Sequence, residues 1–215
     1  MVKIFDLIDK VKDINPLILH YTNNVTITDC ANATLAIGAS PLMSFSYEEV
    51  DDIVKVSSNE VKFDVIRGNI SEIQFLGGLD VNGKGVDSFD DGSDSTHIVE
   101  SVAKKLECVV VASGKIDLIS DGETTYKIQN GSSKLKFITG TGCMSTSLIG
   151  SFLPCADNII DAAVMGTLAM SISGEIADKE NPAIGTYKTL LFDNLFLLNK
   201  ETLETYARVD IKGIN

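Results

Sequence analysis

The feature that most constrains the fold is a run of small residues between an apolar segment and a helical pattern. Residues 138–143 read ITGTGC and lead directly into the apolar and small residues 144–149. This order predicts a strand, a tight turn and a helix. Two glycines let backbone N–H groups turn inward, and the first helical turn adds unpaired donors and the positive end of its dipole. The segment therefore predicts an anion-binding site or, alternatively, a plain strand-to-helix turn.

The cysteine in this turn, Cys143, favours the anion-binding interpretation. A helix N-terminus favours a thiolate, so this side chain points where the anion donors point. The other cysteines, Cys30, Cys108 and Cys155, form no C-x-x-C pair, and the chain has only two histidines. We therefore expect no zinc site, and we expect reduced thiols of which these three lie in the core.

Length and charge limit the classes of partner. The chain has 215 residues and a formal net charge of -12, with no linker that divides it. One domain is expected, and an acidic surface argues against binding nucleic acid or an anionic membrane. No uninterrupted apolar segment of signal-peptide or membrane-spanning type is evident, so a cytoplasmic protein is the expectation.

Strand-like and helical patterns alternate along the chain, which predicts an α/β layer sandwich. The run 108–112 (CVVVA) suits a strand buried on both faces of a mainly parallel sheet. Asp121 and Gly122 predict a hairpin between 116–120 and 124–128, and thus an antiparallel edge. Helices are expected at 4–14, 31–37, 46–56 and 99–106 and over most of 143–206, with further strands at 17–19, 41–43 and 63–66.

Five predicted turns follow predicted strands, at Asn23, Met43, Arg67, Ser113 and Gly140. Ligands of open α/β sheets bind at the carboxyl ends of strands. We therefore expect these turns to converge on one site.

Three polar residues near these turns allow two interpretations each. Asn69 followed by Glu72 is the spacing of a helix capping box, but a carboxylate there is also suited to ordering Mg²⁺ beside ATP, next to Arg67. Asp117 is expected to be an exposed hairpin residue rather than a ligand.

Two glycine patterns do not qualify as nucleotide motifs. Residues 78–85 (GLDVNGKG) approach the P-loop pattern but have Gly85 where a hydroxyl residue must bind Mg²⁺. Gly140 and Gly142 are followed by Ser145 where a dinucleotide fingerprint needs its third glycine. Neither a P-loop nor a dinucleotide fold is expected.

Four segments in order resemble the hydroxyethylthiazole kinase family of the ribokinase-like superfamily. They are 19–25 (LHYTNNV), 38–43 (GASPLM), 66–72 (IRGNISE) and 139–143 (TGTGC). The resemblance implies a single domain over 1–215, a three-layer sandwich with a mainly parallel central sheet flanked by helices. It also implies phosphorylation of 4-methyl-5-(2-hydroxyethyl)thiazole by ATP and Mg²⁺, for thiamine synthesis, in a homotrimer with substrate pockets between subunits.

The resemblance also implies roles for individual residues. Met43 and Gly140 would contact the thiazole and Asn23 would line its pocket. Cys143 stands where other ribokinase-like enzymes have a catalytic aspartate, and it would orient or deprotonate the alcohol.

The remaining implied roles concern ATP and the metal. Arg67, Ser113, Thr139 and Gly142 would bind ATP, although the family usually has threonine at the position of Ser113. Glu72 would serve Mg²⁺.

One departure from the family lies near 57–63. Only residues 58–62 (SNEVK) stand where the family has a strand-helix-strand segment with Asn-Ile-Gly-Thr and Asp-Pro-Val-Gly motifs. Its loss would remove parallel strands and an aspartate that helps order the magnesium site. Either the protein lacks this segment or the sequence omits it.

Two other functions remain open. The same fold serves hydroxymethylpyrimidine kinases, although Cys143 and the loop at 22–24 argue against that substrate. A non-catalytic relative that only binds nucleotide or thiazole is the second alternative.

Overall fold

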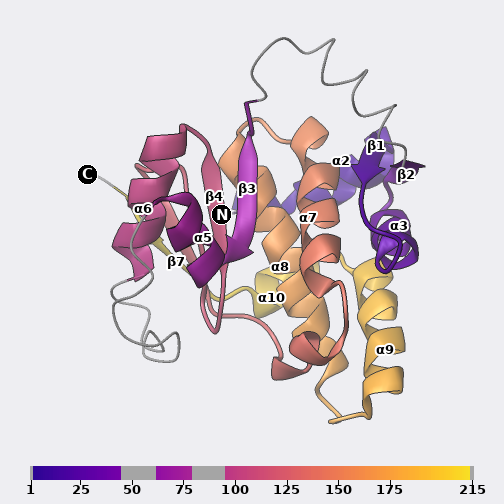
Figure 1. Cartoon of the computed structure of the whole chain (residues 1–215). Helices are drawn as coiled ribbons and strands as arrows, with labels where there is room; N and C mark the ends of the chain where they lie inside the picture. The colour runs from indigo at the N-terminus through magenta and orange to yellow at the C-terminus, as the bar shows by residue number, and fades with distance from the viewer. Residues whose placement is uncertain (1, 45–61, 79–94, 214–215) are drawn as a thin grey trace.

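The computed structural model describes residues 2–44, 62–78 and 95–213 (Figure 1). The helix expected at 46–56 and most of the glycine-rich segment 78–85 lie outside these residues. The helices are α1 (Val2–Phe5), α2 (Leu7–Ile14), α3 (Ile27–Ala36), α5 (Ile70–Leu76), α6 (Ser95–Leu106), α7 (Thr141–Phe152), α8 (Ile159–Ala177), α9 (Ile184–Leu197) and α10 (Lys200–Tyr206). The strands are β1 (Leu17–Tyr21), β2 (Ser40–Ser44), β3 (Val65–Asn69), β4 (Val109–Ser113), β5 (Asp117–Ser120), β6 (Thr125–Ile128) and β7 (Val209–Lys212), with 3-10 turns η1 (Ser133–Phe137) and η2 (Leu153–Cys155).

The described strands form two sheets. A five-stranded sheet has the order β3-β4-β5-β6-β7, and β1 pairs in parallel with β2. β3 and β4 are parallel, whereas the remaining pairs of the larger sheet are antiparallel. The α/β prediction is confirmed, with mixed pairing. The predicted hairpin is also confirmed, but it is not the sheet edge, because β7 pairs with β6.

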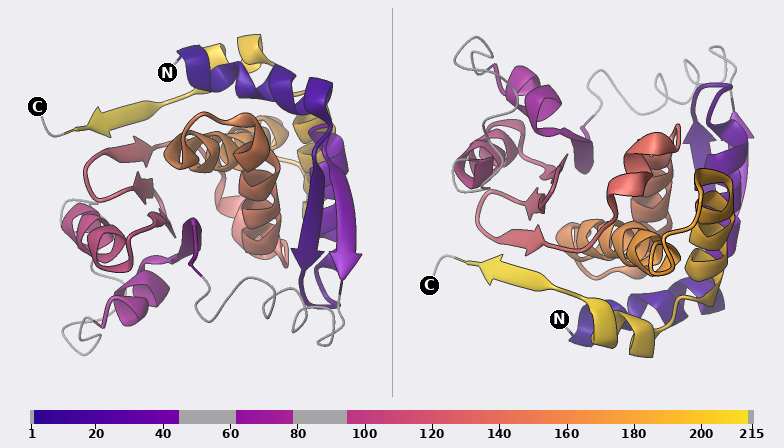
Figure 2. Two further views of the ribbon diagram at one scale, coloured as in Figure 1. Left: turned by 90° about the horizontal axis from the view of Figure 1, so that it is seen from above. Right: turned by 90° about the horizontal axis from the view of Figure 1, so that it is seen from below.

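Helices cover both faces of the larger sheet. α5 and α6 contact β4 on one face, and α8 contacts β4 and β5 on the other. Figure 2 shows α7 and α8 between the two sheets. The larger sheet therefore lies between two helical layers, and β1 and β2 lie on the far side of α7 and α8.

The central strand β4 explains this layering. Val109 and Val111 belong to the large core cluster formed with α7 and α8, whereas Val110 and Ala112 belong to the cluster formed with α5 and α6. Alternate side chains of a strand point to opposite faces, so a continuous apolar run fits burial on both. The prediction of a doubly covered strand is confirmed.

Helix α8 is largely apolar around its circumference, and other elements enclose it. Within the described residues it is the one helix whose length and hydropathy would suffice to cross a membrane, and 72% of that stretch is buried. This burial is typical of the central helix of a layered core.

Several element boundaries differ from the sequence prediction; α3, for example, begins at Ile27 rather than at residue 31, and two further differences concern residue 138 and Arg67. Residue 138 does not form a strand, because η1 precedes it and the Ile138 N–H donates to Leu135 O at 3.2 Å. The Ser132 hydroxyl accepts from the Lys134 N–H at 3.0 Å and so begins that turn. Arg67 and Asn69 lie within β3 rather than in a turn after it.

Candidate active site

The first turn of α7 rests on the loop that follows β1. Gly140 is the N-cap residue and has φ 87°, a conformation that glycine adopts without strain. A Cβ on Gly140 would lie 2.6 Å from Thr26 Cγ2. The predicted turn and helix are thus confirmed, and the turn requires glycine for both conformation and space.

Asn23 shapes the loop that Gly140 contacts. Its Oδ1 accepts hydrogen bonds from the N–H groups of Val25 and Thr26 at 3.0 and 3.2 Å, and from Thr26 Oγ1 at 3.3 Å. Thr26 is buried. Thr26 contacts both Asn23 and Gly140, so the structure brings these two residues together. The sequence predicted this convergence for the turns that follow its strands.

Arg67 reaches the same turn from β3. A Cβ on Gly142 would lie 2.6 Å from Arg67 Nη1, so the guanidinium lies against the N-terminal turn of α7. Arg67 Nε is buried and has no hydrogen-bond partner among the described residues. Burial lowers the pKa of Arg67, while the nearby Asp117, Glu72 and Cys143 act in the opposite direction. A partly buried cation with a buried, unsatisfied Nε donor is suited to receive an anion.

A cavity of about 520 Å³ opens beside Arg67. Its lining contains three cationic side chains, Arg67, Lys115 and Lys136, together with Ser113 at the end of β4. The Ser113 hydroxyl donates to Gly68 O at 3.2 Å, which joins β4 to β3 beside Arg67. Cations and hydroxyls at the carboxyl ends of parallel strands suit a polyphosphate.

Asp117 also lines this cavity, so the expectation of an exposed hairpin residue is wrong. Its Oδ1 accepts from the Gly114 N–H at 3.0 Å and its Oδ2 accepts from Ser171 Oγ at 3.1 Å. Burial raises the pKa of Asp117, while these bonds and the charge of Arg67 oppose the rise. The sequence offered no sign that Ser171 of α8 would cover β5 here.

Glu72 forms the capping box that the sequence spacing predicted. The Asn69 N–H donates to Glu72 Oε2 at 2.7 Å, and the Glu72 N–H donates to Asn69 Oδ1 at 2.9 Å. The described residues contain no cluster of three or more potential metal-ligating side chains. A single carboxylate with a remaining oxygen, near Arg67, still fits Mg²⁺ held mainly by substrate phosphates.

The other predicted residues lie outside the cavity lining. Met43 pairs with His20 in the β1-β2 register and packs against the core, while Thr139 precedes the N-cap of α7. Cys143 is half-buried in the first turn of α7 and packs against the same core. The structure therefore brings Arg67, Ser113 and Gly142 together, and Asn23 with Gly140, but leaves Met43 apart from that cavity.

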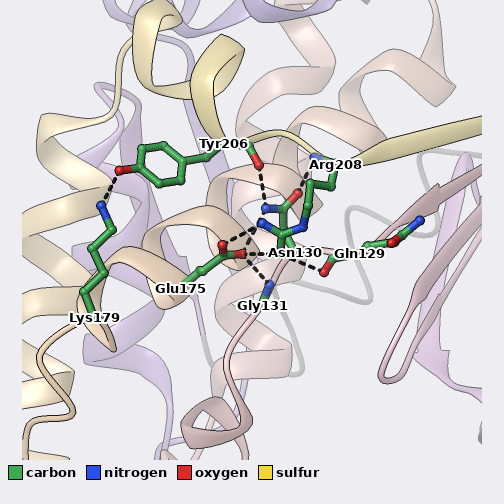
Figure 3. Close-up of polar contacts among 7 residues, drawn as sticks. All are labelled: Gln129, Asn130, Gly131, Glu175, Lys179, Tyr206 and Arg208. Atoms are coloured by element: carbon green, nitrogen blue, oxygen red, sulfur yellow. Dashed lines mark hydrogen bonds and ion pairs between the residues drawn. The ribbon is translucent and has the colours of Figure 1, made fainter.

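A hydrogen-bond network that the sequence did not indicate holds another wall of the cavity (Figure 3). Asn130 is buried, donates to Glu175 Oε2 at 3.0 Å and Tyr206 O at 2.8 Å, and accepts from the Arg208 N–H at 2.8 Å. Asn130 and its neighbour Gly131 line the cavity. The network thus fixes that wall to α8 and to the chain after α10.

Arg208 completes this network through its side chain. Its Nη1 and Nη2 donate to the two oxygens of Glu175 at 2.7 and 2.8 Å, and Nη2 also donates to Gln129 O at 3.0 Å. These bonds raise the pKa of Arg208 and lower that of Glu175, in which the same hydrogen bonds outweigh burial. Such a bidentate pair fixes geometry as well as charge.

Comparison with known proteins gives one consistent result. The sequence model of the hydroxyethylthiazole kinase family matches residues 8–61 and 58–201. Hydroxyethylthiazole kinase of Clostridioides difficile is 47% identical, covering 96% of this chain and 98% of the relative. The enzyme of the same name from Alkaliphilus oremlandii is 35% identical, covering 95% and 96%.

A solved structure shares the fold. The structure of hydroxyethylthiazole kinase protein from Pyrococcus horikoshii has a TM-score of 0.83, with 24% identity, covering 99% of this chain and all of that chain. The alignment with the C. difficile relative spans 258 positions, more than the 215 residues of this chain. Part of the relative therefore has no counterpart here.

Proposed function

This chain belongs to the hydroxyethylthiazole kinase family, and we propose that it transfers the γ-phosphoryl group of ATP to the primary hydroxyl of 4-methyl-5-(2-hydroxyethyl)thiazole. The product is the thiazole phosphate used to make thiamine. The observation that carries the proposal is the partly buried Arg67, whose buried Nε has no partner among the described residues and whose Nη1 lies against Gly142. Phosphoryl transfer asks mainly for positioning and for neutralisation of charge.

The cavity beside Arg67 is proposed as the ATP site. Arg67 and Ser113 lie on its wall, and the amides from Gly140 to Cys143 would hold the migrating phosphoryl group. Lys115 and Lys136 add positive charge on the same wall. This arrangement offsets the triphosphate charge locally, although the chain as a whole is acidic.

Glu72 is the residue proposed to serve Mg²⁺. When bound, Mg²⁺ shields the charge of the phosphate oxygens. The capping bond from Asn69 uses Glu72 Oε2 and fixes the carboxylate over Gly68, where a Cβ would lie 2.9 Å from that oxygen. The other carboxylate oxygen is then held at a defined place beside Arg67.

Cys143 and the residues after β1 are proposed to handle the alcohol. The thiol lies in the first turn of α7, where it would orient the hydroxyl or accept its proton. Proton removal comes late when bond formation lags bond breaking, so a strong base is not needed. Asn23, Met43 and Gly140 are proposed to line the thiazole pocket.

A homotrimer with substrate pockets between subunits is the proposed assembly. β1 and β2 expose Leu17, Leu19 and Leu42 at 69%, 47% and 51%, and Leu35 and Phe196 are exposed on α3 and α9. Exposed large apolar residues on these elements suit contact with another subunit. Size-exclusion chromatography with light scattering tests it, and a monomer with full activity would contradict it.

The chain is further proposed to be one domain over 1–215 that lacks a strand-helix-strand segment near 57–63. Two observations support this: the family match divides at 58–61, and within the described residues β1 pairs only with β2 and β3 only with β4. Intact mass of the protein purified from its natural source tests whether the segment is absent. A cytoplasmic location is proposed from the reaction and from the burial of α8.

A coupled assay of ADP release tests the function directly. Turnover is expected with the thiazole alcohol and Mg²⁺, and not with a hydroxymethylpyrimidine alcohol. Preferential turnover of the pyrimidine would favour the other kinase, and binding of both ligands without ADP release would favour a non-catalytic protein.

A further inference from the structure

Among the described residues that line the cavity beside Arg67, one is acidic, Asp117. A carboxylate in a site for a triphosphate repels the ligand unless a nearby cation balances it. Asp117 must therefore make a favourable contribution that outweighs this repulsion. Asp117 is not among the residues assigned to ATP, thiazole or metal above.

The first part of the argument is the bonding of the carboxylate. One oxygen accepts from the Gly114 N–H and the other from Ser171 Oγ, at 3.0 and 3.1 Å. Asp117 thereby ties the turn after β4 to helix α8. That turn carries Ser113 and Lys115, which both line the cavity.

The second part is the relation between Asp117 and Arg67. Both side chains line the cavity without a direct ion pair among the described contacts, and each charge shifts the pKa of the other group toward its charged form. Burial opposes the charged form of both groups. Each charge therefore lowers the cost of burying the other, and the guanidinium of Arg67 keeps its donors for a ligand.

We infer that Asp117 is a positioning residue for nucleotide binding: its anchored carboxylate keeps Arg67 in the cavity and fixes the turn at 113–116. The inference rests on the proposed ATP site. It assigns no proton transfer to Asp117, because both oxygens are engaged in accepting hydrogen bonds.

The test is Asp117→Asn, which keeps the shape and removes the charge. The amide oxygen still accepts from Gly114, and the amide nitrogen donates to the Ser171 hydroxyl. Loss of a partly buried charge partner is expected to weaken ADP binding and raise the KM for ATP about tenfold. The KM for the thiazole alcohol should stay unchanged. Ser171→Ala, which removes one bond but keeps the charge, is the matched control and should change ADP binding about threefold or less.

A double-mutant cycle separates positioning through Arg67 from a general structural effect. In an Arg67→Gln background, Asp117→Asn should cause no further loss of ADP binding. An equal loss in both backgrounds, or no loss in the wild-type background, would overturn the inference. ADP binding by calorimetry needs no turnover, so wild-type protein that binds ADP but does not phosphorylate the alcohol refutes the proposed function alone. Wild-type protein that binds no ADP refutes both.

Discussion

Arg67 lines the cavity, whereas Arg208 bonds to the lining residue Asn130, and the two arginines differ in exposure and in hydrogen bonding. Arg208 is half exposed and donates to both oxygens of Glu175, which raises its pKa. Arg67 is more deeply buried, its Nε lacks a partner among the described residues, and burial lowers its pKa. A paired arginine at the surface holds segments of the chain together. A partly buried arginine whose buried Nε lacks an acceptor costs stability in the free protein, and a bound anion recovers that cost.

Arg67→Gln is the variant with the largest expected effect, and it tests whether Arg67 differs from Arg208 in function. Loss of a partly buried cation proposed to contact phosphate is expected to raise the KM for ATP about a hundredfold or more. The melting temperature should change little, because removal of a cation with an unsatisfied Nε offsets the loss of the charge that favours ionised Asp117. Steady-state kinetics and calorimetric scanning measure both. A large loss of stability with little change in the KM would show that Arg67 is structural, like Arg208.

Cys143→Ser tests whether the chemistry depends on the thiol or on the charges around it. We expect kcat to fall by a factor of about ten to a hundred, which is no more than the smallest rate contribution typical of a proton-transfer group. ATP binding should be retained, because the amides and Arg67 remain. Complete loss of turnover with intact ATP binding would contradict the view that positioning dominates.

Gly142→Ala tests the approach of Arg67 to α7. The added Cβ would lie 2.6 Å from Arg67 Nη1 and must displace it, so the KM for ATP should rise about tenfold. Gly150→Ala in the same helix is the matched control, because its Cβ would meet Ile18 Cγ2 at an ordinary 3.7 Å. The control should keep its kinetics and gain a little stability from helix propensity. Equal kinetic effects of the two variants would refute the proposed contact.

Glu175→Gln removes the negative charge that pairs with Arg208. It has the smallest expected effect on turnover. Stability should fall by about 1 kcal/mol, a value discounted for the partial exposure of the pair. The pKa of Glu175 is lowered from its ordinary value of 4.5, so its stabilisation is present above that pH and is lost as pH falls through the lower, folded-state pKa. Chemical unfolding of both proteins between about pH 6 and 3 checks this. A difference that does not shrink toward acid pH would contradict the ionic role of Glu175.

The sequence was most informative where chemistry is local. The left-handed Gly140, the capping box of Asn69 and Glu72, and the doubly buried strand β4 each depend on near neighbours or on a run of apolar residues. The contact between Arg67 and Gly142 was predicted only indirectly, from the expected convergence of the turns after the strands and from the resemblance to a known family.

The features that the sequence did not predict depend on contacts between residues that are far apart in the chain. Asp117 was misjudged because its environment depends on Ser171, which is 54 residues away, and on Arg67. The network around Asn130 was missed for the same reason, since its partners Glu175 and Arg208 lie 45 and 78 residues on. The strand β7 was not predicted either, because a short polar segment becomes a strand only where β6 offers an edge.

The bonds of Asn130 have a practical consequence for handling the protein. The last strand is joined, through Arg208 and the carbonyl of Tyr206, to the residues that bound the cavity. Trimming the carboxyl end back past Arg208 would release that wall and loosen its grip on a nucleotide, although no deleted residue lines the cavity itself. Purification tags and fusion partners are therefore better attached at the amino end, or placed after β7 with a spacer that leaves its pairing with β6 undisturbed.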